Sequence, residues 1–150
     1  MILDNFFQSL INDPVSILGL AVFYILLVNL PISLSAFFSK KTPLIVRMLT
    51  ISVNLFITLQ LFLRWLISGH FPISNLYESL YFLTWGITMG QLLIEREYQS
   101  PIIPSIAIPV ELFTVAFACF VLPEELKLSS NLVPALRSSW LVMHVSVVML

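Results

Sequence analysis

Hydrophobic and polar residues follow one another along this chain in long blocks. The first apolar block contains no charged residue between Asp13 and Lys40, a stretch of 26 residues. A helix needs about 20 mostly apolar residues to cross the hydrocarbon core of a bilayer. Because backbone N–H and C=O groups must be satisfied within the lipid, such a block predicts a transmembrane α-helix.

The same pattern recurs and predicts an all-α fold, a polytopic transmembrane helical bundle with four full spans and the start of a fifth. Short polar turns separate the blocks, and residues 1–150 form a single multi-pass membrane region. Prolines are expected to kink the first span at Pro31 and to bend or loosen the start of the fourth. The predicted spans are residues 15–38, 44–67, 78–94 and 102–122, with an incomplete run at 140–150.

The two ends of the chain add two expectations. Apolar residues within 2–13 fall on one helical face and polar residues on the other, which predicts a short helix lying in the membrane interface. The last apolar run has 11 residues. Such a helix is about 16 Å long, too short to cross a bilayer. We therefore expect the chain to be the N-terminal part of a longer protein.

Composition supports a membrane protein and excludes several other classes. Hydrophobic residues make up 59% of the chain and charged residues 10%, whereas soluble domains carry about 25% charged residues. Membrane lipid is the expected environment. A net charge of -1 without a basic tract gives nucleic-acid binding no electrostatic support. The single cysteine, Cys119, excludes an intramolecular disulfide, a Cys-x-x-Cys-His haem attachment site and a dithiol reductant in this sequence.

The positions of Lys and Arg predict an orientation. One side of the predicted bundle carries Lys40, Lys41, Arg47 and Arg96, and the other carries Arg64, Lys127 and Arg137. The positive-inside rule places the first of these sides toward the cytoplasm. His70 and His144 are then expected near the opposite, luminal side. Arg47 and Arg64, close to the two ends of the second span, are expected to extend their side chains toward the membrane surface.

Residues 69–79, GHFPISNLYES, connect the second and third spans and contain one of the two histidines. Gly69 suits the C-cap of a helix. Asn75 and Glu78 have the spacing of a capping box at the start of the next span. Chain geometry thus explains most of this stretch, and His70 stays open as an interfacial residue or a ligand.

His144 is the strongest candidate for a site residue, because an ionisable side chain within a span is costly and functional by default. In a helix, Arg137, Trp140 and His144 share one face. The imidazole could ligate haem iron, the indole could stack on a flat ring and the guanidinium could pair with an acidic group. No other metal site is expected. The alternative is a hydrogen-bonded histidine beside a belt tryptophan and a surface arginine, and the sequence leaves both open.

Glu111 falls in the middle of the fourth span. Three roles are open for it: a neutral buried carboxyl, a carboxylate facing a polar cavity, or a proton relay. The spacing Gly86-x-x-x-Gly90 favours close helix packing. Nucleotide-binding, metalloprotease and nucleophile-elbow motifs do not occur, so the pattern alone assigns no reaction.

Two stretches, GHFPISNLYESLYFLTW at 69–85 and SSNLVPALRSSWLVMHVSVVML at 129–150, resemble the N-terminal half of the CcsA family, the cytochrome c biogenesis proteins of chloroplasts and cyanobacteria. The resemblance implies a membrane assembly factor required for delivering haem and attaching it to c-type apocytochromes on the luminal side. It also implies a thylakoid membrane, a CcsB-type membrane partner, and a place in a haem lyase-like complex with haem as cargo.

The resemblance assigns a role to His144, which matches a family histidine that acts as an axial haem ligand on the outer side. Glu111 departs from the family pattern, and the family's tryptophan-rich segment lies beyond residue 150. Two other functions remain open. One is a b-type electron-transfer subunit with His70 and His144 as paired axial ligands, and the other is a structural or transport subunit.

Overall fold

The computed structural model describes residues 14–69, 71–73, 75–123 and 139–150. In these ranges all regular secondary structure is helical, and there is no strand. The interfacial helix predicted within residues 2–13 lies outside them. The elements are α2 (Pro14–Ser39), α3 (Leu44–Ser68), α4 (Leu76–Tyr98), α5 (Ile102–Ala116), the π-helical turn η1 (Phe117–Val121) and α7 (Ser139–Met149).

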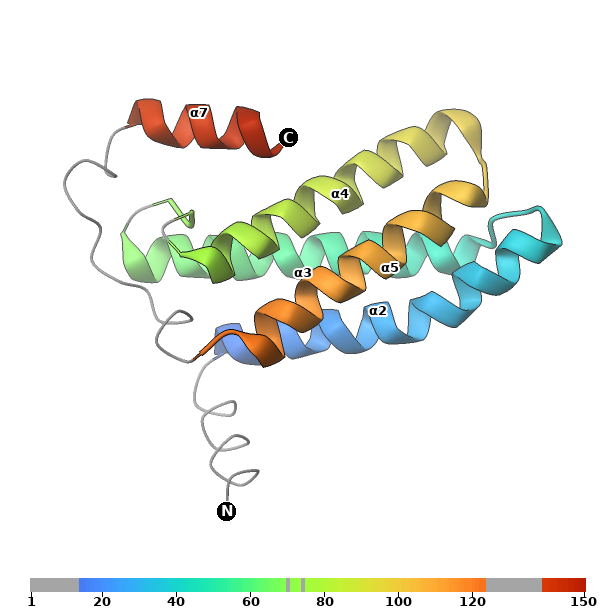
Figure 1. Cartoon of the computed structure of the whole chain (residues 1–150), viewed down its shortest axis with the longest axis horizontal. Helices are drawn as coiled ribbons and strands as arrows, with labels where there is room; N and C mark the ends of the chain where they lie inside the picture. Colours follow the sequence, from blue (N-terminus) through green and yellow to red (C-terminus); the bar gives the residue numbers. More distant parts are fainter. Residues whose placement is uncertain (1–13, 70, 74, 124–138) are drawn as a thin grey trace, which may run out of the picture.

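The four long helices lie side by side and alternate in direction (Figure 1). α2 packs against α3 and α5, and α4 packs against the same two helices. α7 runs along the outside of this bundle, and Leu150, which follows it, lies next to Gly86 of α4. The alternation places residues 40–43 and 99–101 at one end of the molecule and residues 69–75 at the other.

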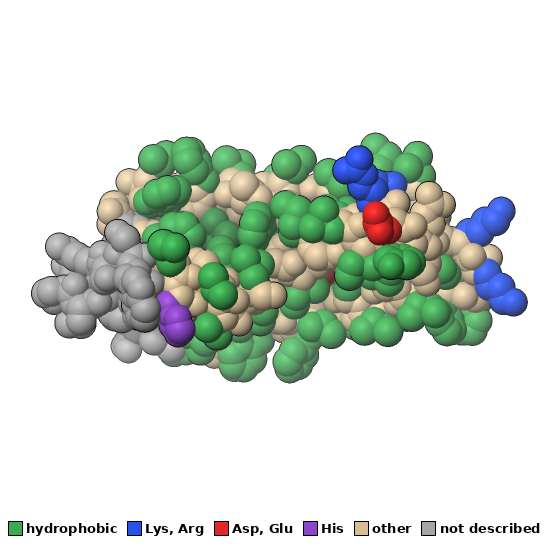
Figure 2. Space-filling model, turned by 90° about the horizontal axis from the view of Figure 1, so that it is seen from above, with side chains coloured by type: hydrophobic (Ala, Val, Ile, Leu, Met, Phe, Trp, Pro, Cys, Tyr) green, Lys and Arg blue, Asp and Glu red, His purple; other side chains and the backbone are tan. Residues whose placement is uncertain are grey.

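Apolar side chains both fill the bundle and cover it. Leu26, Ile57 and Ile108 are fully buried in the core, whereas Phe38 is 84% exposed and Phe113 is 73% exposed. Figure 2 shows hydrophobic side chains spread over the whole length of the surface. Three helical stretches are long and apolar enough to cross a membrane, namely Val15–Ser39, Leu44–Ser68 and Ile102–Val121. The chain is therefore a multi-pass membrane protein.

The prediction of four full spans is not confirmed, because α4 is not among these candidates. The reason is its polar content. Thr84, Thr88, Gln91 and Glu95 of α4 are all buried, at 3% exposure or less. Their side chains lie inside the bundle, where three more apolar helices separate them from the surroundings. The mean hydropathy of α4 therefore includes its buried polar residues and does not describe its outward surface alone.

The prolines do not interrupt the helices. α2 continues as one helix through Pro31, and a kink there stays a prediction. α5 contains Pro109, yet it is helical from Ile102, and the irregular turn occurs at its other end as η1. Ser105 supports the start of α5, since its hydroxyl lies 2.7 Å from the carbonyl oxygen of Pro101 and 3.1 Å from that of Ser33 and can donate its hydrogen to either. The start of α5 is therefore not loosened, and a bend there stays a prediction.

A glycine on α2 lies directly against two tyrosine side chains of α4. A Cβ atom at Gly19 would lie 2.6 Å from the Tyr81 hydroxyl oxygen and 3.1 Å from that of Tyr77. Real Cβ atoms essentially never show the shorter distance, so a side chain here requires Tyr81 to move. The contact of α2 with these two tyrosines thus depends on the absence of a side chain at position 19.

We predict that Gly19→Ala lowers the free energy of unfolding by about 1–3 kcal/mol, the usual cost of overpacking a core. Thermal unfolding in detergent measures the change. Gly90→Ala is the matched control, since a Cβ there meets nothing within 4 Å. Adding Tyr81→Phe to Gly19→Ala removes the nearest atom and should restore part of the loss. Equal stability of the Gly19 and Gly90 variants would contradict the close approach.

Candidate functional site

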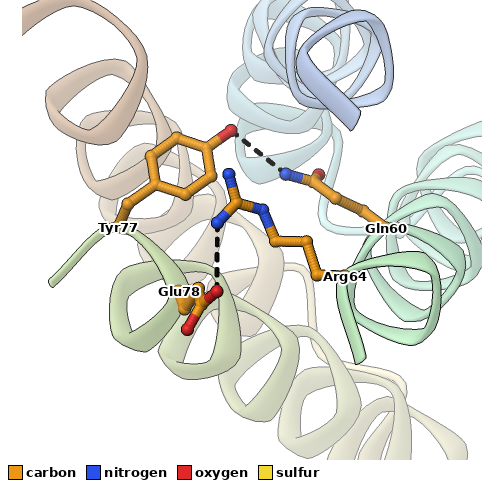
Figure 3. A network of polar contacts seen from close by, with 4 residues as sticks. All are labelled: Gln60, Arg64, Tyr77 and Glu78. Carbon is orange, nitrogen blue, oxygen red and sulfur yellow. Dashed lines mark hydrogen bonds and ion pairs between the residues drawn. The ribbon is translucent and has the colours of Figure 1, made fainter. Parts of the chain in front are cut away.

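A buried ionic network occupies the end of the bundle where α3 meets α4 (Figure 3). Arg64 Nη1 donates a hydrogen bond to Glu78 Oε1 at 3.1 Å, and the two side chains are only 8% and 0% exposed. The guanidinium carbon of Arg64 lies 4.5 Å from the centre of the Tyr77 ring. Gln60 Nε2 donates to the Tyr77 hydroxyl at 3.1 Å. A cation, an anion and an aromatic ring thus share one dry site.

Local chain geometry brings these four side chains together. Gln60 and Arg64 stand four residues apart, on one face of α3. Gly69 ends α3 in the left-handed conformation, with φ of 69°, and its N–H donates to the Trp65 carbonyl at 2.9 Å. This confirms the predicted C-cap. The short connection that follows delivers the first turn of α4, with Glu78, beside the last turn of α3.

Two predictions for this region are wrong. Arg64 does not extend to the membrane surface but is 7% exposed. Asn75 is the N-cap residue of α4 but makes no side-chain capping hydrogen bond, and Glu78 pairs with Arg64. A buried charge requires a counter-charge, which matters more than one capping bond. Opposite charges on both sides of a short turn were the sequence signal for this pair.

An aromatic chain holds the connection between α3 and α4 against the bundle. The Phe71 ring lies 5.6 Å from the ring of Trp65 and 6.1 Å from that of Phe82, both edge to face. Phe82 then stacks on Trp85 at 5.8 Å. Offset and edge-to-face ring pairs add to the stability gained by burial. Phe71 therefore holds the connection between the two helices against both α3 and α4.

A second contact links this network to the end of the fourth predicted span. The Tyr81 hydroxyl lies 3.1 Å from Cys119 Sγ, and the rings of Tyr77 and Tyr81 are 4.8 Å apart. Cys119 is buried and, as the single cysteine of the sequence, forms no disulfide within the chain. Because it belongs to η1, the π-helical turn packs directly against the tyrosines of α4.

The structure describes only part of the predicted haem face. His144 is exposed on α7, whose first turn lies at the same end of the bundle as residues 69–75 (Figure 1). His70 and Arg137 lie outside the described residues, as does the side chain of Trp140. The shared face of Arg137, Trp140 and His144 stays a prediction. Across the described residues, no group of three or more His, Cys, Asp or Glu is arranged to hold a metal ion.

Comparison with known proteins identifies the family. Residues 73–150 match the family described as Cytochrome C assembly protein. The chain belongs to this family. The match begins just before α4 and contains Glu78, Cys119 and His144, but not Arg64.

The chain is also similar to curated proteins named cytochrome c biogenesis protein CcsA. It is 83% identical over 150 residues to that of Prochlorococcus marinus strain MIT 9215, covering 100% of this chain and 48% of the relative. It is 73% identical over the same length to that of subspecies pastoris strain CCMP1986, again covering 48% of the relative. With strain NATL1A, identity is 59% over 137 residues, covering 91% of this chain and 44% of the relative. The chain spans about half the length of these relatives.

We predict that Glu78→Gln and Arg64→Met each lower the free energy of unfolding by about 3–5 kcal/mol, because each leaves one buried charge without its partner. Denaturant or thermal unfolding in detergent measures the loss. The double variant Arg64→Met, Glu78→Leu should lose less than either single variant, since it leaves no isolated charge.

The matched control is Glu97→Gln, which removes an exposed carboxylate from the same helix and should change stability by no more than about 0.5 kcal/mol. If Glu78→Gln behaved like this control, the ion pair would contribute nothing to the fold.

Proposed function

We propose that this chain is part of a membrane assembly factor for c-type cytochromes, which delivers haem for attachment to apocytochromes. The observation that carries the proposal is the family match over residues 73–150, which contains His144. The names of the relatives and the multi-pass membrane fold support it. The chain itself would bind and present the haem, whose own vinyl groups and iron supply the chemistry.

The proposed location is the thylakoid membrane, with the haem-handling end in the lumen. Lys40, Lys41 and Arg47 line one pocket and define what we call the basic end. Figure 2 shows Lys and Arg side chains gathered toward one end of the molecule. Positively charged ends of membrane proteins face the cytoplasm as a rule. His70 and His144 would then lie toward the lumen, and the cyanobacterial relatives fit a thylakoid membrane.

In this proposal His144 is an axial ligand of the haem iron. Because His144 is exposed on α7, a haem group could reach its imidazole from outside the bundle. Trp140 would stack on the porphyrin plane, and Arg137 would pair with a propionate group. A histidine ligand also biases the redox state of the iron, which matters because thioether formation requires reduced haem. His70 is the alternative ligand.

A single ligand does not complete a haem site. The relatives are about twice as long as this chain, so residues outside the chain are proposed to supply the rest of the site. A CcsB-type membrane protein is the proposed partner, and c-type apocytochromes are the proposed acceptors. α4 is proposed as a fourth span, because it runs antiparallel to its neighbours over a similar length.

The haem ligand is tested by the absorption spectrum of the purified full-length protein. We predict a Soret band that is lost in His144→Ala and restored when imidazole is added, because free imidazole can occupy the vacated position on the iron. His70→Ala is the matched control and should keep the band. If the band survived in His144→Ala and disappeared in His70→Ala, the axial ligand would be His70 instead.

Cytochrome c maturation in cells that carry these variants separates haem handling from the other two functions. We expect His144→Ala to lose mature c-type cytochromes and His70→Ala to retain them. Normal maturation with His144→Ala would favour a structural or transport subunit. A reducible haem spectrum without any effect on maturation would favour an electron-transfer subunit.

The fourth span is tested by labelling with a membrane-impermeant maleimide. Cys119 is the single cysteine, so Cys119→Ser gives a background without thiols. Leu76→Cys and Gln99→Cys then report on the two ends of α4, since both positions are exposed. We predict that they react from opposite sides of the membrane and that Lys41→Cys reacts from the same side as Gln99→Cys. Labelling of positions 76 and 99 from one side would exclude the span.

A further inference from the structure

A group of polar side chains inside the bundle, near the basic end, has no part in the proposed haem site. Asn29 Nδ2 donates a hydrogen bond to Thr50 Oγ1 at 3.2 Å. Gln91 Nε2 donates to the same Thr50 oxygen at 3.3 Å and to Glu95 Oε1 at 2.8 Å. All four side chains are at most 3% exposed. They connect α2, α3 and α4 through a single hydroxyl group.

The carboxyl group of Glu111 joins this interior from α5. It is fully buried, and neither of its oxygens has a hydrogen-bond partner among the described residues. α5, which carries Glu111, packs against α4, which carries Glu95, and the charge of Glu95 acts on Glu111. The one ion pair found in the described residues is the distant Arg64–Glu78 pair. Two negative charges buried in this way would each cost several kcal/mol.

Apart from the hydroxyl of Thr42 in the pocket lining, the unpartnered atoms of this region are all hydrogen-bond acceptors. Besides both oxygens of Glu111, they are Asn29 Oδ1, Gln91 Oε1 and Glu95 Oε2. Buried polar atoms are nearly always paired, so an interior with surplus acceptors lacks donors. A carboxylate that takes up a proton loses its charge and becomes a donor. Binding of a proton therefore both lowers the buried negative charge and supplies a hydrogen-bond donor.

A pocket of about 440 Å³ at the basic end reaches this interior from outside. Glu95 forms part of its lining, together with Lys40, Lys41, Arg47 and Gln99. A water molecule occupies about 30 Å³ in the liquid, so the pocket has room for several. Glu95 consequently lies between the pocket and the hydrogen-bonded interior, to which it is joined by its bond from Gln91.

We propose that Glu95 and Glu111 form a proton-binding pair inside the bundle, which exchanges protons with the pocket at the basic end. Glu95 accepts the proton at the pocket, and Glu111 holds it deeper in the bundle. The other ionisable groups are placed where they do not neutralise Glu111. Arg47 acts on Glu95 from the pocket side, and the one ionisable side chain of α2, Tyr24, is 60% exposed.

The titration of Glu111 would depend on that of Glu95, because the charge of Glu95 acts on it. Glu95 lies at the opposite end of the bundle from the proposed haem ligand, and Glu111 lies in the middle of the fourth predicted span. The proton-binding pair does not rest on the haem proposal, and the variants that test it leave His144 unchanged.

Infrared difference spectroscopy on the full-length protein in lipid nanodiscs tests the proposal directly. At pH 7 exposed glutamates are ionised, since their ordinary pKa is about 4.3. We expect the carbonyl stretching band of a protonated carboxyl to persist at pH 7 and to disappear as the pH is raised further. Glu111→Gln should lose this band. Glu95→Gln should keep it but shift its midpoint to lower pH, because the remaining carboxyl no longer ionises beside a second negative charge.

Glu97→Gln is the matched control, as it removes an exposed carboxylate two residues from Glu95. It should leave both the band and its midpoint unchanged. A band that survives in Glu111→Gln would overturn the assignment. A second result would also overturn the assignment. If the band were absent at every pH and the thermal stability rose with Na⁺ at constant ionic strength, the site would bind a metal cation.

A second measurement needs no variant and therefore does not depend on whether Glu111→Gln folds. Carbodiimides react with protonated carboxyl groups, and the acyl group becomes attached to the carbodiimide as a stable acylurea. We expect an apolar carbodiimide to modify Glu111 at pH 7, as found by mass spectrometry of peptides, and modification to fall as pH rises. Labelling of Glu97 alone, or labelling of Glu111 that does not fall with pH, would contradict a proton-binding pair.

Discussion

The constraint on which the rest of the structure depends is that polar side chains within a membrane must be covered by protein. α4 carries Thr84, Thr88, Gln91 and Glu95 along one side, and all of them are buried. A helix with these residues is stable in lipid only if that side faces other helices. α2, α3 and α5 supply the cover, and their outward surfaces are apolar enough to face lipid. The order of the helices around α4 follows from this requirement.

The same requirement determines how each end of the bundle is built. At the α3–α4 end, the charge of Glu78 is balanced within the protein by Arg64, and the Tyr77 ring lies against the guanidinium. Inside the bundle, Glu111 has no such partner among the described residues, and Lys40, Lys41 and Arg47 line an open pocket at the basic end instead. A closed ion pair is a rigid structural element. Unbalanced acceptors beside water are the arrangement expected of a site that takes up a proton.

The sequence predicted the helices well, and it predicted their partners poorly. Long apolar blocks and the glycine at position 69 determine where helices begin and end through local geometry, so the bounds of α2 and α3 were within reach of the pattern. The Arg64–Glu78 pair was missed because each residue also fits a local role, as a surface cation and as a capping residue. Choosing between local and long-range partners requires knowing which faces pack together, and hydrophobic periodicity does not contain that information. Glu111 was recognised as unusual, but its neighbour Glu95 was assigned to a surface turn.

The proposed haem ligand and the two buried glutamates lie in different parts of the molecule, which has a consequence for function. The proposed haem ligand, His144, lies on a helix outside the bundle, whereas Glu95 and Glu111 are buried within it, Glu95 at the basic end. A large planar molecule cannot enter an interior in which Leu26, Ile57 and Ile108 are fully buried, but a proton can move along hydrogen-bonded side chains and water. Haem would therefore be handled on the outer surface of the described bundle, beside α7. The interior would be left to small ions, and the core packing between the two ends keeps the two sites chemically separate.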